Sequence, residues 1–148
     1  MKRDMDLIQG LDAGKRQPQR NMAPMLTLAA SLVLAGCATQ PVADSKAERV
    51  TAPAFGRSDA ADTVIVITHD SGFSNGGSNA HILIDGRDAI RLRPSQQVRL
   101  YVSAGEHLVA VAQNDDNVQS AAETVTRLGS ERRFRISAQP GRFDLIPQ

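Results

Sequence analysis

The chain has 148 residues, which is enough for one ordinary domain with tails. Its 17 basic and 16 acidic side chains give a formal net charge of +1, so the bulk charge does not indicate a nucleic-acid-binding protein. Only 3% of the residues are aromatic and none is Trp, which argues against a stacking platform for bases or sugars.

The first informative segment is an apolar run that ends at the single cysteine, Cys37. Basic residues precede the run, which extends from Met25 to Ala35, and the small residues Ala35 and Gly36 close it. A positive region, a short apolar region and small residues at the end are the parts of an export signal. A transmembrane helix needs about 20 apolar residues, so this run is too short for a stable membrane span.

The tetrapeptide Leu34-Ala35-Gly36-Cys37 resembles the lipobox of bacterial lipoproteins. The resemblance implies that the signal, residues 1–36, is cleaved before Cys37, whose sulfur then carries a diacylglycerol while the new amino terminus is acylated. A thiolate is a strong nucleophile, which suits such an alkylation. Ala38 follows the cysteine in place of Asp, which by analogy with enterobacterial sorting implies the periplasmic face of the outer membrane. The alternatives are a plain secretory signal with a chance cysteine, or a cysteine of the hydrophobic core.

Residues 37–62 mix Ala, Pro, Ser and charged residues without a sustained apolar period. After the lipidated cysteine that the lipobox resemblance implies, this composition predicts a flexible tether. A flexible chain of this length has a root-mean-square reach of roughly 27 Å, which would hold a domain clear of the lipid head groups.

Residues 63–148 change to the pattern of short strands. The first segment, "TVIVIT" (63–68), is continuously apolar and β-branched, which predicts a central strand buried on both faces. "HILIDG" (81–86) predicts a second strand that ends in a tight Asp85-Gly86 turn. Alternation in the next two segments predicts these inward residues: Ile90, Leu92, Val98, Leu100 and Val102.

The remaining segments continue this pattern to the end of the chain. "EHLVAVAQN" (106–114) predicts a strand and "VQSAAETVTRL" (118–128) a weaker strand or strand pair. "RRFRIS" and "RFDLIP" predict strands with Phe134, Ile136, Phe143 and Leu145 inward. About seven short strands at this spacing predict an all-β fold, a small antiparallel β-sandwich of the immunoglobulin or transthyretin type.

Two stretches of this region carry a resemblance to known proteins. "HILIDGRDAIRL" and the later "QQVRLYVSAGEHLVAVA" resemble PEGA-type sandwich domains of bacterial envelope proteins, in which a V-D-G hairpin precedes a P-P-G-x-H turn. "THDSGF" (68–73) is similar to the "TRDSGF" that opens the domain of small envelope lipoproteins of undefined function. Ser103-Ala104 stand where PEGA-type turns carry prolines. The resemblance implies a fold and an envelope location, and it implies no reaction.

The stretch Gly72-Phe73-Ser74-Asn75-Gly76 matches the G-x-S-x-G pattern of a hydrolase nucleophile elbow. An elbow needs a helix directly after the serine, whereas the residues after Gly76 lead into the next predicted strand. Asp85 and His107 follow Ser74 in the order of a catalytic triad, so a small serine hydrolase using Ser74 and His107 is the alternative to a non-enzymatic protein. A glycine-rich turn is the simpler interpretation, and we assign no catalytic residue.

The same loop also carries residue types that bind metal ions. His69, Asp70 and His81 flank the loop, but two imidazoles and one carboxylate at this spacing are not a specific signal. The glycines of the loop lack both the lysine of a P-loop and the spacing of a dinucleotide fingerprint. We therefore predict no metal site and no cofactor besides the covalent lipid on Cys37.

Five arginines alternate with core positions on three predicted strands: Arg91, Arg93, Arg99, Arg133 and Arg135. If those strands are neighbours, the guanidinium groups would form one patch that binds phosphate or carboxylate groups. The alternative is a solvated face whose arginines pair with Asp88, Glu123 and Glu131.

Together these features predict a non-enzymatic, lipid-anchored envelope protein that acts as a binding or structural module. Its partners would be the membrane, through the lipid anchor, and an envelope protein or an anionic glycan or lipid, with no nucleic acid. A third interpretation is an accessory protein of a secretion or envelope complex that docks through the arginines.

Overall fold

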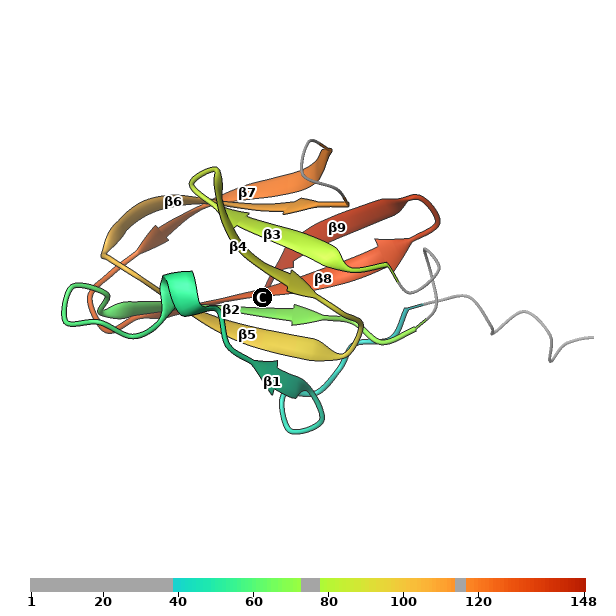
Figure 1. The fold of residues 1–148 in the computed structure, drawn as a ribbon, viewed down its shortest axis with the longest axis horizontal. Coiled ribbons are helices and arrows are strands. Elements are labelled where there is room, and N and C mark those ends of the chain that lie inside the picture. Colours follow the sequence, from blue (N-terminus) through green and yellow to red (C-terminus); the bar gives the residue numbers. More distant parts are fainter. Residues whose placement is uncertain (1–38, 73–77, 114–116) are drawn as a thin grey trace, which may run out of the picture. The chain divides into compact units, whose positions relative to one another are not determined.

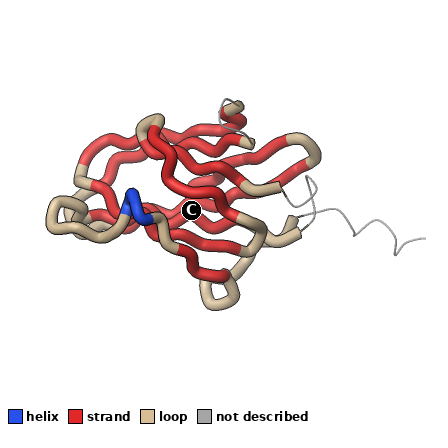
Figure 2. The backbone as a smooth tube through the Cα atoms, viewed as in Figure 1, coloured by secondary structure: helices blue, strands red, loops and turns tan. Residues whose placement is uncertain are grey.

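The computed structural model describes residues 39–72, 78–113 and 117–148. The predicted lipobox, Leu34 to Cys37, and the loop serine Ser74 therefore lie outside the described residues. The described part is built from strands and one turn of 3-10 helix, with no α-helix (Figure 2). No helix in this part is long and apolar enough to cross a membrane.

The elements follow one another in chain order, as Figure 1 shows. They are β1 (Glu48–Val50), η1 (Pro53–Phe55), β2 (Thr63–His69), β3 (Ala80–Ile84), β4 (Arg87–Leu92), β5 (Gln96–Val102), β6 (Gly105–Ala112), β7 (Val118–Thr126), β8 (Glu131–Gln139) and β9 (Arg142–Pro147).

The strands form a five-stranded sheet with the order β1-β5-β2-β8-β9 and a four-stranded sheet with the order β4-β3-β6-β7. The smaller sheet is antiparallel, as predicted. The larger sheet is mixed, because β1 pairs with β5 and β2 pairs with β8 in parallel. The all-β prediction is confirmed, and the prediction of antiparallel pairing is wrong for the larger sheet. Alternation along a strand reports which side is buried, but not which strand lies beside it.

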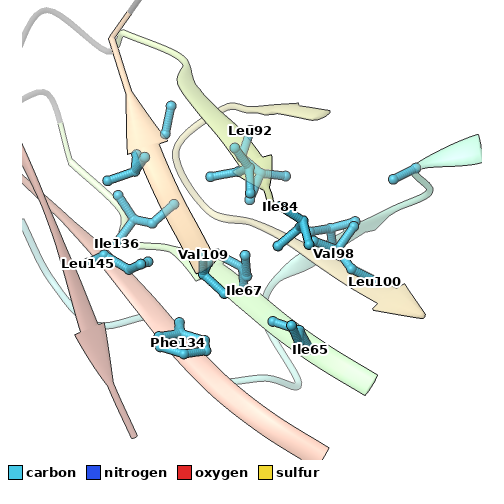
Figure 3. Packing of buried hydrophobic residues seen from close by; sticks show 14 of the residues in the cluster. Ile65, Ile67, Ile84, Leu92, Val98, Leu100, Val109, Phe134, Ile136 and Leu145 are labelled. Atoms are coloured by element: carbon cyan, nitrogen blue, oxygen red, sulfur yellow. The ribbon is translucent and has the colours of Figure 1, made fainter. Parts of the chain in front are cut away.

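One hydrophobic core lies between the two sheets (Figure 3). The larger sheet contributes side chains such as Ile65, Ile67 and Leu100, and the smaller sheet contributes Ile84 and Val109. The inward residues predicted from alternation are confirmed as buried: Leu92, Val98, Leu100, Val102, Phe134, Ile136, Phe143 and Leu145. Ile90, also predicted inward, is partly buried against this core.

The chain after residue 38 pairs with the sheets instead of extending as the expected flexible tether. Gln40 and Ser71 exchange two backbone hydrogen bonds of 3.0 Å, and the hydroxyl oxygens of Thr39 and Ser137 lie 3.1 Å apart. Further along, β1 adds a parallel edge to β5. Composition indicated a tether because these contacts use backbone and hydroxyl groups, which leave no apolar period in the sequence.

Two residues of the same segment enter the hydrophobic core. Ala52 is 3% exposed and Phe55 is 9% exposed, and both belong to the cluster of buried residues between the sheets. The guanidinium carbon of Arg87 lies 5.7 Å from the centre of the Phe55 ring, within the range of a cation–π contact. Residues 39–62 therefore belong to the same folded body as the later strands.

The predicted turn between β3 and β4 is confirmed. Asp85 has φ +53° and Gly86 has φ +73°, so both central residues of the turn are left-handed. A two-residue hairpin with this geometry matches the right-handed twist of its strands, which explains the Asp-Gly pair.

Side chains of β7 satisfy two backbone donors of β9. The Phe143 N–H donates to Gln119 Oε1 at 2.6 Å, and the Leu145 N–H donates to Ser120 Oγ at 3.1 Å. β7 is an edge of the smaller sheet and β9 is an edge of the larger one. These bonds connect the sheets on one side and occupy donors that would otherwise be open to edge-to-edge association.

We expect Gln119→Ala to lower the free energy of unfolding by about 1–2 kcal/mol, because it leaves the partly buried Phe143 N–H without its acceptor. Urea unfolding measures this change. Gln139→Ala is the matched control, since Gln139 is exposed and its Nε2 donates to another side chain, Asp144 Oδ2. Equal effects of the two substitutions would contradict the proposed role of Gln119.

Candidate functional site

Three of the five predicted arginines lie on the outer face of the larger sheet. The pairing register places Arg99 of β5 and Arg133 of β8 on opposite sides of Val66 in β2. Arg135 lies beside Thr68 in the next outward position. Strands that are not neighbours in the sequence therefore bring these side chains together, which the sequence pattern could not establish.

A carboxylate connects the first two of these arginines. Arg99 Nη2 donates to Glu131 Oε2 at 2.8 Å, and Arg133 Nη1 donates to Glu131 Oε1 at 2.6 Å. Because Arg99 and Glu131 belong to the strands on either side of β2, their ion pair extends over β2. Val66, which lies between Arg99 and Arg133 in the pairing register, is only 1% exposed.

Asp44 adds a second carboxylate to this group, which we call the β2 ion-pair network (Asp44, Arg99, Glu131 and Arg133). Asp44 forms an ion pair with Arg133 and accepts a hydrogen bond of 2.9 Å from Gln97 Nε2. Sequence analysis missed Asp44, because its residue type and spacing gave no sign that the segment after Cys37 packs on the sheet.

The network keeps its arginines engaged within the protein. Burial opposes the charge on Arg99, but hydrogen bonds to Glu131 and Tyr101 outweigh this effect and raise the pKa of Arg99. Arg135 has its own carboxylate, with Nε 3.4 Å from Asp70 Oδ2. An external anion at these three arginines would have to displace a carboxylate of the protein.

The other two predicted arginines lie elsewhere. Arg91 is on β4 of the smaller sheet, opposite His81 of β3. Arg93 follows β4, and its Nη2 lies 3.9 Å from Glu48 Oε1. Three of the five arginines therefore lie on the larger sheet, one on the smaller sheet and one in the loop after β4, so they do not form a single continuous patch.

The residues considered as metal ligands do not gather at one point. His69 faces the core, with Nδ1 3.2 Å from the Leu92 carbonyl oxygen, and burial lowers its pKa. Asp70 is 1% exposed beside Arg135, and burial raises its pKa despite the nearby guanidinium group. His81 Nε2 instead lies 3.1 Å from Asp88 Oδ1. No group of three His, Cys, Asp or Glu side chains within the described ranges could hold a metal ion.

The structure does bring Asp85 and His107 together. His107 Nδ1 lies 2.8 Å from Asp85 Oδ2, and His107 Nε2 lies 2.9 Å from the Ser103 carbonyl oxygen. Both partners are oxygen acceptors, so the geometry favours a ring that is protonated on both nitrogens. The Leu108 N–H also donates to Asp85 Oδ1 at 2.8 Å.

This pair lies away from the described ends of the G-x-S-x-G loop. Gly72 and Ser78 flank the loop before β3 begins, whereas Asp85 follows the last residue of β3. A strand rises about 3.3 Å per residue, so β3 separates the two positions. The geometry gives His107 a role in closing the turn at Asp85, and the hydrolase alternative stays a prediction because Ser74 lies outside the described residues.

A pocket lies beside the β2 ion-pair network, between residues 49–57 and the β5 residues Gln97, Arg99 and Tyr101. Its volume is about 320 Å³. Its lining includes the guanidinium-bearing residues Arg49, Arg57 and Arg99 and the apolar residues Val50 and Ala52. Sequence analysis identified only Arg99, because Arg49 and Arg57 belong to the segment that was expected to be a tether.

Comparisons of the chain with protein-family models, with curated proteins and with solved structures give no match. The resemblance to PEGA-type domains and to small envelope lipoproteins therefore stays a prediction. The function is argued from the residues themselves.

We expect the pKa of His107 to lie above 6.5. Burial opposes its charge, but the bonds to Asp85 and Ser103 outweigh burial and raise the pKa of His107 while lowering that of Asp85. The contribution of His107 to stability is therefore lost as the pH rises through its raised pKa, and that of Asp85 is lost as the pH falls through its lowered pKa. NMR titration of the His107 ring measures the first effect.

Asp85→Asn is the matched variant for this titration, since it keeps the shape of Asp85 and removes its charge. The pKa of His107 should fall in this variant. A His107 pKa below 6.5 in the unmodified chain, or one unchanged by Asp85→Asn, would contradict the assignment.

We also expect Glu131→Gln to lower the free energy of unfolding by about 1 kcal/mol, because it removes the charge shared by Arg99 and Arg133. The difference should shrink in 1 M salt, where exposed ion pairs are screened. Glu123→Gln on β7 is the control, because an exposed carboxylate outside the network should change stability by less than about 0.5 kcal/mol. Urea unfolding at two salt concentrations distinguishes the two variants, and a salt-independent loss would count against an ionic role.

Proposed function

We propose that this chain is a lipid-anchored envelope protein whose all-β body acts as a binding or structural module without catalysis. The proposal rests on the tetrapeptide Leu34-Ala35-Gly36-Cys37, which closes an apolar run too short to span a bilayer. Acyl chains contribute about 0.8 kcal/mol per buried methylene, so two or more chains on Cys37 would give a stable anchor.

The position of the first described residues supports a body close to the membrane rather than at the end of a tether. Thr39 contacts Ser137, and Gln40 pairs with Ser71. Only two peptide units separate Cys37 from Thr39, so their Cα atoms lie within about 7 Å of each other. A lipid on Cys37 would therefore place this end of the strands next to the head groups.

We also propose an immunoglobulin- or transthyretin-like sandwich that is held at the periplasmic face of the outer membrane. Two sheets that face each other across one core support an immunoglobulin- or transthyretin-like sandwich, and Ala38 supports retention at the periplasmic face of the outer membrane. The internal pairing of Arg99, Arg133 and Arg135 supports a structural role for the arginine-bearing face more than a docking role for it.

Growth of cells on labelled palmitate tests the anchor. The chain should carry the label and sediment with the membranes, and Cys37→Ser should lose both properties because the chain has no second cysteine. Ala38→Ser is the control, since it changes the neighbouring residue and keeps the thiol. An unlabelled wild-type chain, or a Cys37→Ser chain that stays labelled, would refute lipidation at Cys37.

A further inference from the structure

We propose that the pocket between residues 49–57 and β5 binds a small molecule or lipid head group in which a carboxylate or phosphate is attached to an apolar portion. The pocket is lined by Arg49, Arg57, Arg99, Gln97 and Tyr101, with Val50 and Ala52 among its apolar residues. This assignment does not depend on lipidation of Cys37, because all of its lining residues belong to the folded body.

The charge around the pocket favours an anion. Arg99 is held by Glu131, but within the described residues Arg49 and Arg57 have no carboxylate partner. Arg57 and Arg99 also line a neighbouring groove of about 210 Å³, where Asp62 is the one acidic residue among the lining residues. Guanidinium groups that surround one pocket repel one another, and a bound carboxylate or phosphate would relieve this repulsion through charge-assisted hydrogen bonds.

The apolar residues favour a ligand that is more than a bare ion. Val50 packs against the hydrophobic core but is only partly buried, so it leaves apolar surface at the pocket, next to the buried Ala52. A phosphate ion would leave this apolar surface in contact with water, whereas a hydrocarbon portion would cover it. A volume of about 320 Å³ is at the lower end of the range of ligand pockets, roughly 300–1,000 Å³, so we infer a small ligand or a single head group.

The pocket is fixed in place by the backbone around it. Parallel pairing with β5 places Arg49 opposite Gln97, and Gln97 Nε2 donates to Thr68 Oγ1 at 2.9 Å. The next turn, η1, is held by the buried ring of Phe55. Little ordering of the backbone is therefore needed on binding, which reduces the entropic cost of association.

NMR titration of the full chain with Cys37→Ser tests the proposal without a covalent lipid. The probes are octanoate, dihexanoyl phosphatidic acid below its micelle concentration, and inorganic phosphate. We expect saturable shifts of the Arg49 and Arg57 side-chain N–H signals with at least one of the first two probes, and much weaker binding of phosphate. Whichever of the first two probes binds with the higher affinity indicates whether the natural ligand is a free carboxylate or a lipid head group.

The double variant Arg49→Gln/Arg57→Gln should bind the same probe at least about tenfold more weakly, because it removes two charge-assisted hydrogen bonds. Arg127→Gln is the control, since Arg127 is exposed and does not line the pocket. If the double variant fails to fold, Arg57→Gln alone serves, because Arg57 lies outside the strands.

Three results would overturn the proposal. They are the absence of saturable binding for both apolar probes, binding that the arginine variants leave unchanged, and phosphate binding as tight as that of the apolar probes. Because the chain used carries no lipid, failure of this experiment is distinct from failure of palmitate labelling at Cys37.

Discussion

Strand β2 is covered on both faces, by apolar side chains on one face and by charged side chains on the other. On the inner side, Ile65 and Ile67 pack in the core between the sheets. On the outer side, Val66 lies between Arg99 and Arg133, and the ion pair of Arg99 with Glu131 spans β2. Long arginine stems can cover apolar surface while the charged ends remain near water. β2 has the continuous apolar pattern of a strand that is buried on both faces, and a body of only two sheets accommodates it because ion-paired arginines cover its outer face. These charges therefore have a structural role.

The segment before β2 is part of the folded body and has several structural roles there. Asp44 joins the ion pairs over β2, Ala52 and Phe55 enter the core, and Arg49 and Arg57 line the pocket beside β5. A single stretch therefore contributes to a network, a core and a candidate binding site. For a chain anchored at Cys37, the same short stretch would connect the lipid anchor to the pocket.

The strands themselves were largely predictable from the sequence, whereas the pairing of the strands within the sheets was not. Alternation identified the inward residues of the later strands, such as Phe134 and Leu145, and the Asp85-Gly86 pair identified its hairpin. The parallel pairing of β2 with β8 has no local signature, because it depends on residues far apart in the chain. For the same reason, the sequence could suggest that arginines share a face but not that Arg91 and Arg99 belong to different sheets. Arg49 and Arg57 were missed because polar composition hid the packing of their segment.

The pairing of β2 with β8 has a consequence for how the chain folds. The centre of the larger sheet joins Val64–His69 to Glu131–Ile136, so it cannot close before the last strands have been made. Contacts between distant parts of a chain slow folding, because a long loop must close before the contacts stabilise anything. If the chain is exported as we propose, slow closure of this sheet would be useful, because a chain that is still unfolded can pass through a narrow translocation channel.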